Sequence, residues 1–395
     1  MRLFISAMAM LLTATFAQAE VRKLYVPCGG QFSGFVKNMK AEAARQGFSK
    51  SVVDGYFNAA SFSKRVINAD RRQGIFKTNF IDFSRKLISQ NRIDRGRSNS
   101  KKYNNIFSAI ERQLGVPRGI LLSFWAFETD FGAFQGDFNT LDALMTLSHD
   151  CRRPDLFQPQ VFAALKLYER GDFSTAVEGA WAGEIGMVQM LPLDILERGF
   201  DGDGDGHVTL KTSVPDALYS GANMLRGFGW RPGEPWLQEV SVPAKLPWED
   251  TGLTRTKKVS EWARLGVKPR VGAFEGPNLR ASILLPMGRK GPAFLAYPNY
   301  HMLFEWNKSF VYVATAAYFA TRLQGAPVYN PGNADAPLSD AQMKALQKAL
   351  AARGHDVGKI DGILGKGTRA AVQAEQRRLG LPADAWPTRE LLNRL

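Results

Sequence analysis

A single acidic residue, Glu128, stands in an apolar and aromatic stretch of the chain. The stretch reads Phe124-Trp125-Ala126-Phe127-Glu128-Thr129-Asp130-Phe131-Gly132. Aromatic neighbours exclude water from a carboxyl group, which disfavours its charged form and raises its pKa. A carboxylic acid that keeps its proton near neutral pH can act as a general acid, and cleavage of a glycosidic bond requires one. A carboxylate at the solvent-exposed end of a core helix would give the same pattern, so the stretch alone leaves both interpretations open.

A glycine-rich segment further along the chain is a candidate for the other side of such a site. It runs from Gly179 to Pro192 and includes Trp181, Glu184 and Gln189. Its small residues let the backbone approach a ligand closely. The amide of Gln189 could bond a sugar hydroxyl, and Glu184 is a candidate for the second carboxylate that a hydrolytic glycosidase needs. A tight turn between two helices is the alternative interpretation.

A later segment, from Glu305 to Tyr312, combines aromatic and amide side chains. Trp306, Asn307 and Tyr312 are suited to stacking on sugar rings and to hydrogen bonding with them. Aromatic residues at such spacings also form protein cores, so this segment supports a sugar-binding site only together with the other two.

An acidic, glycine-rich run has the pattern of the opening of an EF-hand calcium loop. Carboxylates alternate with glycines in the order Asp201-Gly202-Asp203-Gly204-Asp205-Gly206. The twelfth position holds Thr212 in place of glutamate, and Asp216 could close a longer loop. Calcium bound here would be structural, because nothing beside the run indicates a need for a nucleophile or a base. An acidic surface turn without a metal is the alternative.

The N-terminal residues, 1–19, have the pattern of a signal peptide. Arg2 is followed by an apolar run from Leu3 to Phe16, and Ala17-Gln18-Ala19 forms a cleavage site. The apolar run is short for a membrane span, and the sequence shows no other run of spanning length. We therefore expect an exported, periplasmic protein without a transmembrane span after cleavage.

Export makes the two cysteines, Cys28 and Cys151, informative. An even number of cysteines in an oxidising compartment favours a disulfide. This disulfide would tie the N-terminal part of the mature chain to the region after Glu128. Two buried free thiols are the alternative.

The net charge points to an anionic partner. It is +14 at pH 7, and removal of Arg2 with the signal peptide leaves 14 − 1 = +13. Export argues against nucleic acid, whereas the bacterial cell wall is a periplasmic polyanion. One basic cluster is interpreted as a solvated, flexible segment: Arg92, Arg95, Arg97, Lys101 and Lys102.

A mainly helical scaffold is expected to position these motifs. Pro117 is placed to open a helix that carries Glu128 near its end, with Gly132 as the stop. The part from 231 to 298 is rich in proline, glycine and tryptophan and is expected to hold short strands. We predict a mainly α (α+β) catalytic domain at residues 20–325.

The C-terminal part is expected to be a separate module. Residues 326–337 are rich in proline, glycine and asparagine and are interpreted as a linker. Residues 338–395 are expected to form three helices, with Thr368 and Thr388 capping the second and third. A module of this size buries only a modest core.

Most of the chain before the linker resembles the B-type lytic murein transglycosylases. The motif that carries the family's catalytic acid corresponds to Trp125, Glu128, Thr129, Phe131 and Gly132. The glycine-rich family motif corresponds to Trp181-Ala182-Gly183, Gly186, Gln189-Met190 and Pro192, and the asparagine motif to Asn307, followed by Tyr312. The calcium loop that some members carry corresponds to Asp201, Asp203, Asp205, the carbonyl of His207, and Asp216. The resemblance implies a lysozyme-like helical fold.

The C-terminal module resembles the peptidoglycan-binding domain family. The matching residues are Asp361-Gly362-Ile363-Leu364-Gly365 and Thr368-Arg369-Ala370-Ala371-Val372. Glu375 stands where that family commonly has phenylalanine. The resemblance implies that the module binds peptidoglycan glycan strands.

The resemblance also implies a mechanism with one carboxyl group and no cofactor. Protonated Glu128 would donate to the oxygen between N-acetylmuramic acid and N-acetylglucosamine. The resulting carboxylate would take the proton of the muramoyl C6 hydroxyl as that oxygen attacks C1, giving a 1,6-anhydro ring. The residues implied to bind the sugars or to lie beside Glu128 are Gln189, Asn307, Tyr312, Trp181 and Trp306.

Two departures from the family pattern affect the surroundings of Glu128. Ala180 stands where members often have a serine that bonds the catalytic glutamate, and Trp306 replaces a tyrosine. Other groups must therefore orient Glu128. Two alternatives stay open: a muramidase that uses Glu184 and water on the same bond, and a non-catalytic wall-binding scaffold.

Overall fold

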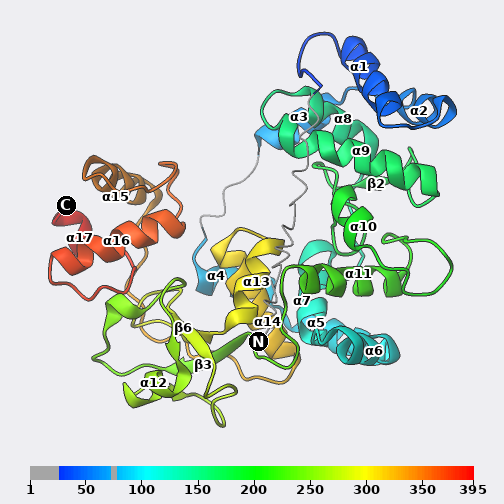
Figure 1. Ribbon diagram of the computed structural model, residues 1–395. Coiled ribbons are helices and arrows are strands. Elements are labelled where there is room, and N and C mark those ends of the chain that lie inside the picture. The colour runs from blue at the N-terminus through cyan, green and yellow to red at the C-terminus, as the bar shows by residue number, and fades with distance from the viewer. Residues whose placement is uncertain (1–25, 73–77) are drawn as a thin grey trace, which may run out of the picture.

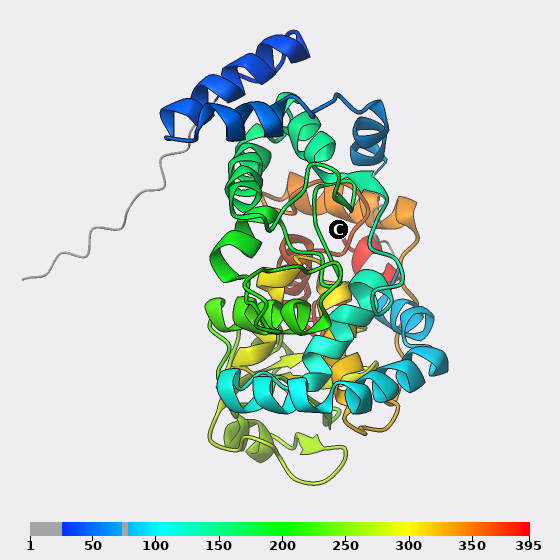
Figure 2. The same cartoon turned by 90° about the vertical axis from the view of Figure 1, so that its right-hand side faces the viewer.

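Helices dominate the part of the chain that the structure describes. This computed structural model describes residues 26–72 and 78–395, so the predicted signal peptide (1–19) lies outside the described residues. Helices α1 and α2 lie at one end of the molecule, and a small sheet with helix α12 lies at the opposite end in two perpendicular views (Figures 1 and 2). The prediction of a mainly α (α+β) fold is confirmed.

The helices before the predicted linker are α1 (Phe32–Arg45), α2 (Lys50–Phe57), α3 (Lys64–Arg71), α4 (Phe80–Leu87), α5 (Gln90–Lys102), α6 (Asn104–Leu114), α7 (Arg118–Thr129), α8 (Thr140–His149), α9 (Pro154–Arg170), α10 (Pro192–Arg198), α11 (Val214–Gly227), α12 (Val259–Arg264), α13 (Pro298–Trp306) and α14 (Phe310–Leu323). The strands are β1 (Phe138–Asn139), β2 (Glu178–Gly179), β3 (Leu237–Ser241), β4 (Lys257–Lys258), β5 (Lys268–Pro269), β6 (Arg280–Leu284) and β7 (Ala293–Ala296), with a 3-10 turn at Trp248–Asp250. The C-terminal helices are α15 (Asp340–Ala352), α16 (Lys366–Arg378) and α17 (Arg389–Asn393).

Helix α7 carries Glu128 and packs along α14. Residues 119–126 of α7 are all buried, as is typical of a helix that is apolar on every side. The two helices cross closely at Gly119, where an added Cβ would lie 2.7 Å from the carbonyl oxygen of Ala320. This close packing holds Glu128, at the C-terminal end of α7, against the first turn of α14.

The ends of α7 differ in detail from the prediction. Pro117 is the N-cap residue, and the helix begins at Arg118. The helix ends at Thr129 because Asp130 adopts a left-handed conformation with φ 51°. The expectation that Gly132 stops the helix was therefore wrong, since Asp130 has already left the helical conformation.

The region from 231 to 298 holds short strands, as predicted. Five strands form an antiparallel sheet in the order β4-β6-β7-β3-β5. The β3–β7 register pairs Leu237 with Ala296. Strand β7 leads directly into α13, which ends at Trp306, so the sheet supports the chain that enters the candidate site.

The C-terminal module has three helices and a small core of its own. The buried residues of this core include Leu346, Leu350 and Leu391. Thr388 caps α17 by accepting from Leu391 N, as predicted. Thr368 was expected to cap α16, but this prediction was wrong, because the helix already begins after Gly365 and Thr368 is buried within its first turn.

The predicted linker, residues 326–337, packs against the preceding domain. The Tyr329 side chain is buried, and its hydroxyl lies 2.9 Å from Ser84 Oγ. Tyr329 N donates to Tyr318 Oη at 3.1 Å, and Asn333 N donates to Lys290 O at 2.8 Å. This segment is therefore held in place along its length, while its bounds stay a prediction.

The predicted disulfide between Cys28 and Cys151 is present. The two Cα atoms lie 5.4 Å apart, and the bond closes a sequence separation of 123 residues. It fastens the chain before α1 to the turn between α8 and α9. The alternative of two free thiols is excluded.

Removal of this disulfide is expected to destabilise the protein. A cross-link of this span restricts the unfolded chain, so the Cys28→Ser/Cys151→Ser variant should lose about 2–5 kcal/mol in the free energy of unfolding. Urea unfolding measures the loss. A reductant should destabilise the wild type by a similar amount and leave the variant unchanged, whereas equal midpoints for the two proteins would contradict this prediction.

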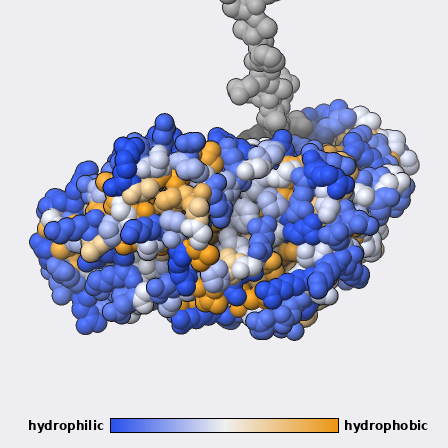
Figure 3. All heavy atoms as spheres, turned by 90° about the horizontal axis from the view of Figure 1, so that it is seen from below, coloured by the Kyte–Doolittle hydropathy of each residue, from blue (hydrophilic) through white to orange (hydrophobic). Residues whose placement is uncertain are grey.

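The surface shows scattered apolar residues. Hydrophilic residues cover most of the face seen in Figure 3, with apolar residues in separate areas. The most exposed large apolar side chain of the described residues is Phe134, with 74% of its surface accessible. Isolated residues of this kind are ordinary on protein surfaces. No helix within residues 26–72 and 78–395 combines the length and the apolar character that a membrane crossing needs.

Candidate active site

Two side chains hold one oxygen of the Glu128 carboxyl group. Trp306 Nε1 donates to Glu128 Oε1 at 3.1 Å, and the Tyr312 hydroxyl donates to the same oxygen at 2.5 Å. Trp306 ends α13 and Tyr312 lies in the first turn of α14, so the turn between these helices brings both donors to Glu128. This arrangement leaves Oε2 as the oxygen that can carry and transfer a proton.

Aromatic rings surround this carboxyl group. Trp306 stacks on Phe124 with ring centroids 4.2 Å apart and an interplanar angle of 11°. Phe127 contacts the Tyr312 ring edge-on at 5.9 Å. The indole of Trp306 is thus fixed by stacking, so its N–H has a defined direction.

Burial raises the pKa of Glu128 to about 7 from an ordinary value of 4.5. The hydrogen bonds from Tyr312 and Trp306 act in the opposite direction because they favour the charged form, and the nearby Glu184 adds a smaller upward effect. Burial also raises the pKa of Tyr312 well above its ordinary value, so this hydroxyl stays a donor. Glu128 therefore holds a proton near neutral pH and can also accept one.

Thr129 joins the two motif segments. Its hydroxyl donates to Met187 O at 2.7 Å and accepts from Gly132 N at 2.9 Å. Met187 belongs to the glycine-rich segment, whose backbone closes on itself through a bridge between Ile185 and Met190. This contact fixes the glycine-rich segment beside the end of α7.

Asp130 binds two arginines of α5. Its carboxylate accepts from Arg92 Nε at 3.0 Å and from Arg95 Nη1 at 2.5 Å. The basic cluster was expected to be a flexible, solvated segment, and this expectation was wrong, because the cluster lies on helix α5 and two of its members pair with Asp130. Asp130 therefore has a structural role.

The structure places Gln189 in a strained turn beside the site. Gln189 has φ 52°, and its Nε2 donates to Gly186 O at 2.8 Å and to Gln135 O at 3.3 Å. A positive φ is costly for a residue with a side chain, so the turn keeps this conformation only because of such contacts. The amide thus braces the loop, and its carbonyl oxygen is the part suited to a ligand.

Glu184 lies in the same segment as Gln189. Its side chain is partly buried, and burial raises its pKa. Its backbone carbonyl accepts from Ala180 N at 2.9 Å. Ala180 itself offers no side-chain donor, so the orientation of Glu128 depends on Trp306 and Tyr312.

A cavity of about 1060 Å³ lies beside the turn between α13 and α14. Trp181 contributes to its lining, as do Ser309 and Phe310 of the turn. Residues 363–366 of the C-terminal module form a further part of the lining. Asn307, at the start of the turn, uses its side-chain oxygen to accept from Ser309 N at 2.9 Å, which leaves its NH2 group for a ligand.

The sequence matches a known family over most of its length. Residues 31–321 match the family described as a transglycosylase SLT domain. The chain belongs to this family. Residues 339–395 of this SLT family member match the family described as a peptidoglycan binding domain.

Relatives and solved structures agree with this assignment. The crystal structure of SltB3 from Pseudomonas aeruginosa in complex with NAG-anhNAM-pentapeptide has a TM-score of 0.84 and 32% identity, covering 93% of this chain and 99% of that chain. The membrane-bound lytic murein transglycosylase B of Escherichia coli K12 is 27% identical over 235 residues, which are 58% of this chain and 63% of that protein. A structure of the Escherichia coli lytic transglycosylase Slt35 with calcium has a TM-score of 0.64 at 23% identity, covering 75% of this chain and 95% of that chain.

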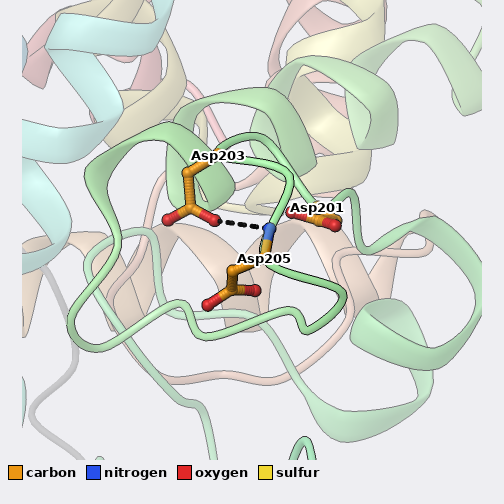
Figure 4. Close-up of side chains that lie close together, drawn as sticks. All are labelled: Asp201, Asp203 and Asp205. Atoms are coloured by element: carbon orange, nitrogen blue, oxygen red, sulfur yellow. Dashed lines mark hydrogen bonds between the residues drawn. The ribbon is translucent and has the colours of Figure 1, made fainter.

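The acidic run of this SLT domain forms a loop between α10 and α11 (Figure 4). Carboxylate oxygens of Asp201, Asp203 and Asp205 lie within 4.8 Å of one another. Asp205 N donates to Asp203 Oδ1 at 3.3 Å. Three clustered carboxylates provide the oxygen ligands that Ca²⁺ prefers.

The other two predicted calcium ligands are placed differently. Asp216 is buried, and its carboxylate accepts from Gly202 N at 2.9 Å and from Thr209 N at 2.7 Å, which ties the two ends of the loop together. His207 Nδ1 lies 2.9 Å from Asp172 Oδ1, and the role of the His207 carbonyl as a ligand stays a prediction. The structure brings three of the predicted ligands together and uses Asp216 as a brace.

The sequence revealed only one of the two groups that hold Glu128, because the resemblance implied that Tyr312 lies beside it. Trp306 was predicted to bind sugar, but the structure uses its N–H for Glu128 and its ring for Phe124. Thr129 was identified from the sequence as a motif residue, but its hydrogen bond to Met187 O was not predicted. The combination of Ala180 with Trp306 was the available signal, because a lost serine donor requires a replacement.

Proposed function

We propose that this protein is a periplasmic lytic transglycosylase that cleaves the β-1,4 bond between N-acetylmuramic acid and N-acetylglucosamine in peptidoglycan. The observation that carries the proposal is the Glu128 carboxyl group, which has a pKa of about 7 and two donors on a single oxygen. The family assignment supports the same reaction. Export, predicted from the sequence, and the disulfide are consistent with the periplasm.

The proposed reaction uses Glu128 twice. Its Oε2 proton moves to the glycosidic oxygen as the bond from that oxygen to C1 breaks. Trp306 and Tyr312 stabilise the carboxylate that forms, because both donate to Oε1. The carboxylate then takes the proton of the C6 hydroxyl as the C6 oxygen attacks C1. The 1,6-anhydro ring forms without water, and Glu128 regains its proton.

The surrounding residues are proposed to hold the glycan. Trp181, which lines the cavity, would stack on a sugar there. The NH2 group of Asn307 and the side-chain oxygen of Gln189 would bond the polar substituents of the glycan. The C-terminal module is proposed to bind peptidoglycan strands, in line with its family match. The reaction requires no cofactor.

A muramidase that uses Glu184 is a weaker alternative. A base or nucleophile must be ionised, but burial raises the pKa of Glu184 and so favours its neutral form. The scaffold alternative does not explain a desolvated carboxyl group with two aligned donors. The transglycosylase proposal accounts for both observations.

The rate is expected to fall as the pH rises through 7. Glu128 must be protonated for the first step, and its pKa is about 7. On soluble glycan fragments, kcat/KM should be nearly constant between pH 5.5 and 6.5 and should fall about tenfold per pH unit well above 7. A profile that rises steadily from pH 6 to pH 9 would contradict the role of Glu128 as the acid.

We further propose that the acidic loop binds a structural calcium ion. The support is the cluster of Asp201, Asp203 and Asp205, whose carboxylate oxygens lie close enough together to coordinate one ion. Addition of Ca²⁺ to protein treated with chelator should raise the stability by about 2.7 kcal/mol at a hundredfold excess over Kd. Thermal unfolding measures this, and Asp203→Asn should abolish the effect while Glu249→Gln, an exposed control, retains it. Equal calcium effects in all three proteins would contradict the site.

A further inference from the structure

The C-terminal module is fastened to the catalytic domain next to the candidate site. Gln373 of α16 donates through Nε2 to Trp248 O at 3.2 Å and to Thr251 O at 3.1 Å. Asp384 accepts from Arg289 N at 2.9 Å. Together with the packed segment 326–337, these bonds hold the module in one position, so it is not a freely tethered anchor.

Arg369 lies at the centre of this contact. Its guanidinium group lies over the Phe310 ring at 4.3 Å and over the Trp386 ring at 5.9 Å. Its Nη2 donates to Pro286 O at 3.0 Å, while its Nε has no partner among the described residues. Burial lowers the pKa of Arg369 to about 10, with Tyr300 and Asp384 acting in the opposite direction. A stack on an aromatic ring is strongest when the cation is desolvated in this way.

Phe310 connects this contact to the candidate acid. It is the first residue of α14, immediately after the turn that Asn307 and Ser309 form. Trp306 precedes this turn and Tyr312 follows it, and both donate to Glu128 Oε1. A displacement of the turn would therefore change both donors at once.

We propose that Arg369 of the C-terminal module is a positioning residue for the reaction, acting through its stack on Phe310 to hold the turn between the two donors of Glu128. This inference rests on the proposed transglycosylase activity. It assigns the module a part in the bond-breaking step, in addition to the binding of peptidoglycan. The planar guanidinium is required because an ammonium group cannot stack in the same way.

The test is a double-mutant cycle with Arg369→Ala, Phe310→Ala and both together in the full chain. The substrate is a soluble, uncross-linked glycan fragment, and binding to insoluble peptidoglycan is measured separately. Each single variant should lower kcat about 5- to 30-fold, with KM and wall binding changed less than twofold. The double variant should lose no more than the worse single variant, because both substitutions break the same contact.

The pH profile distinguishes positioning from a general loss of structure. Weaker bonds from Trp306 and Tyr312 would favour the charged form of Glu128 less, so the fall in kcat should move to higher pH in Arg369→Ala. Arg369→Lys should recover only part of the rate. Arg377→Ala, an exposed arginine on the same helix, is the matched control and should behave as the wild type.

Several outcomes would overturn the inference. Unchanged kcat with weaker wall binding would show that the module is an anchor only, and losses that multiply in the double variant would show that the two residues act independently. If Arg369→Ala fails to fold, Phe310→Leu carries the same test. If the wild-type protein makes no anhydro product, the proposed function is refuted. If the wild type makes this product and the variants are fully active, only the inference about Arg369 is refuted.

Discussion

Glu128→Gln is expected to lower the rate of glycan cleavage about 10³-fold or more, because one side chain supplies both the acid and the base. Glutamine has a similar shape and can still accept from Trp306 and Tyr312, but it cannot transfer a proton. Release of soluble fragments from purified peptidoglycan measures the loss. The matched control, Glu178→Gln, changes an exposed glutamate and should retain the wild-type rate.

The stability of Glu128→Gln separates lost chemistry from lost structure. In the wild type, the folded pKa of about 7 lies above the ordinary value of 4.5, so the folded state binds more protons and its stability falls as the pH rises through this window. The cost reaches up to about 3 kcal/mol above pH 7. Glutamine has no charge to desolvate, so the variant should be more stable than the wild type at pH 8. A variant that is inactive and less stable at pH 8 would not support the catalytic role.

Tyr312→Phe is expected to lower kcat about 10- to 100-fold. Hydrogen bonds to charged groups contribute about 1.5–3 kcal/mol, and this bond to Glu128 is strongest when the carboxylate forms during the reaction. KM should change little, because the hydroxyl bonds the enzyme's own carboxyl group. Tyr219→Phe, which changes a tyrosine that stacks on Phe200, is the control.

The pH dependence gives Tyr312→Phe a second readout. The hydroxyl favours the charged form of Glu128, so its removal should raise the pKa of Glu128 and move the fall in rate to higher pH. Trp306→Phe should act in the same direction, since phenylalanine keeps the stack on Phe124 but loses the donor. A shift to lower pH, or a change in KM alone, would contradict this role and would favour sugar binding by these rings.

The sequence predicted those parts of the fold that depend on local pattern. Thr388 caps α17 as predicted, because a threonine directly before a helical pattern offers an acceptor to the first free N–H groups. The disulfide followed from export and an even number of cysteines. The end of α7 was missed by a few residues, because Asp130, a residue type that tolerates the left-handed conformation, leaves the helix before Gly132.

The environment of Glu128 could be predicted only in part. Aromatic neighbours in the sequence indicated a desolvated carboxyl group, and the pKa of about 7 agrees with that expectation. Local pattern did not identify the donors, because Tyr312 reaches Glu128 through the packing of α14 on α7, and Trp306 reaches it from the end of α13. Only the family resemblance pointed to Tyr312. The packing of the C-terminal module against the catalytic domain was not predicted either, because a segment rich in proline and glycine is also typical of a free linker.

The mass of the product tests the central claim most directly. Purified peptidoglycan should be digested with wild-type protein in water enriched in ¹⁸O, and the soluble fragments should be analysed by mass spectrometry. The account predicts 1,6-anhydro fragments that are lighter than reducing-end fragments by one water molecule and contain no ¹⁸O. Reducing-end fragments as the main new product, in place of 1,6-anhydro fragments, would show attack by water and would contradict the account.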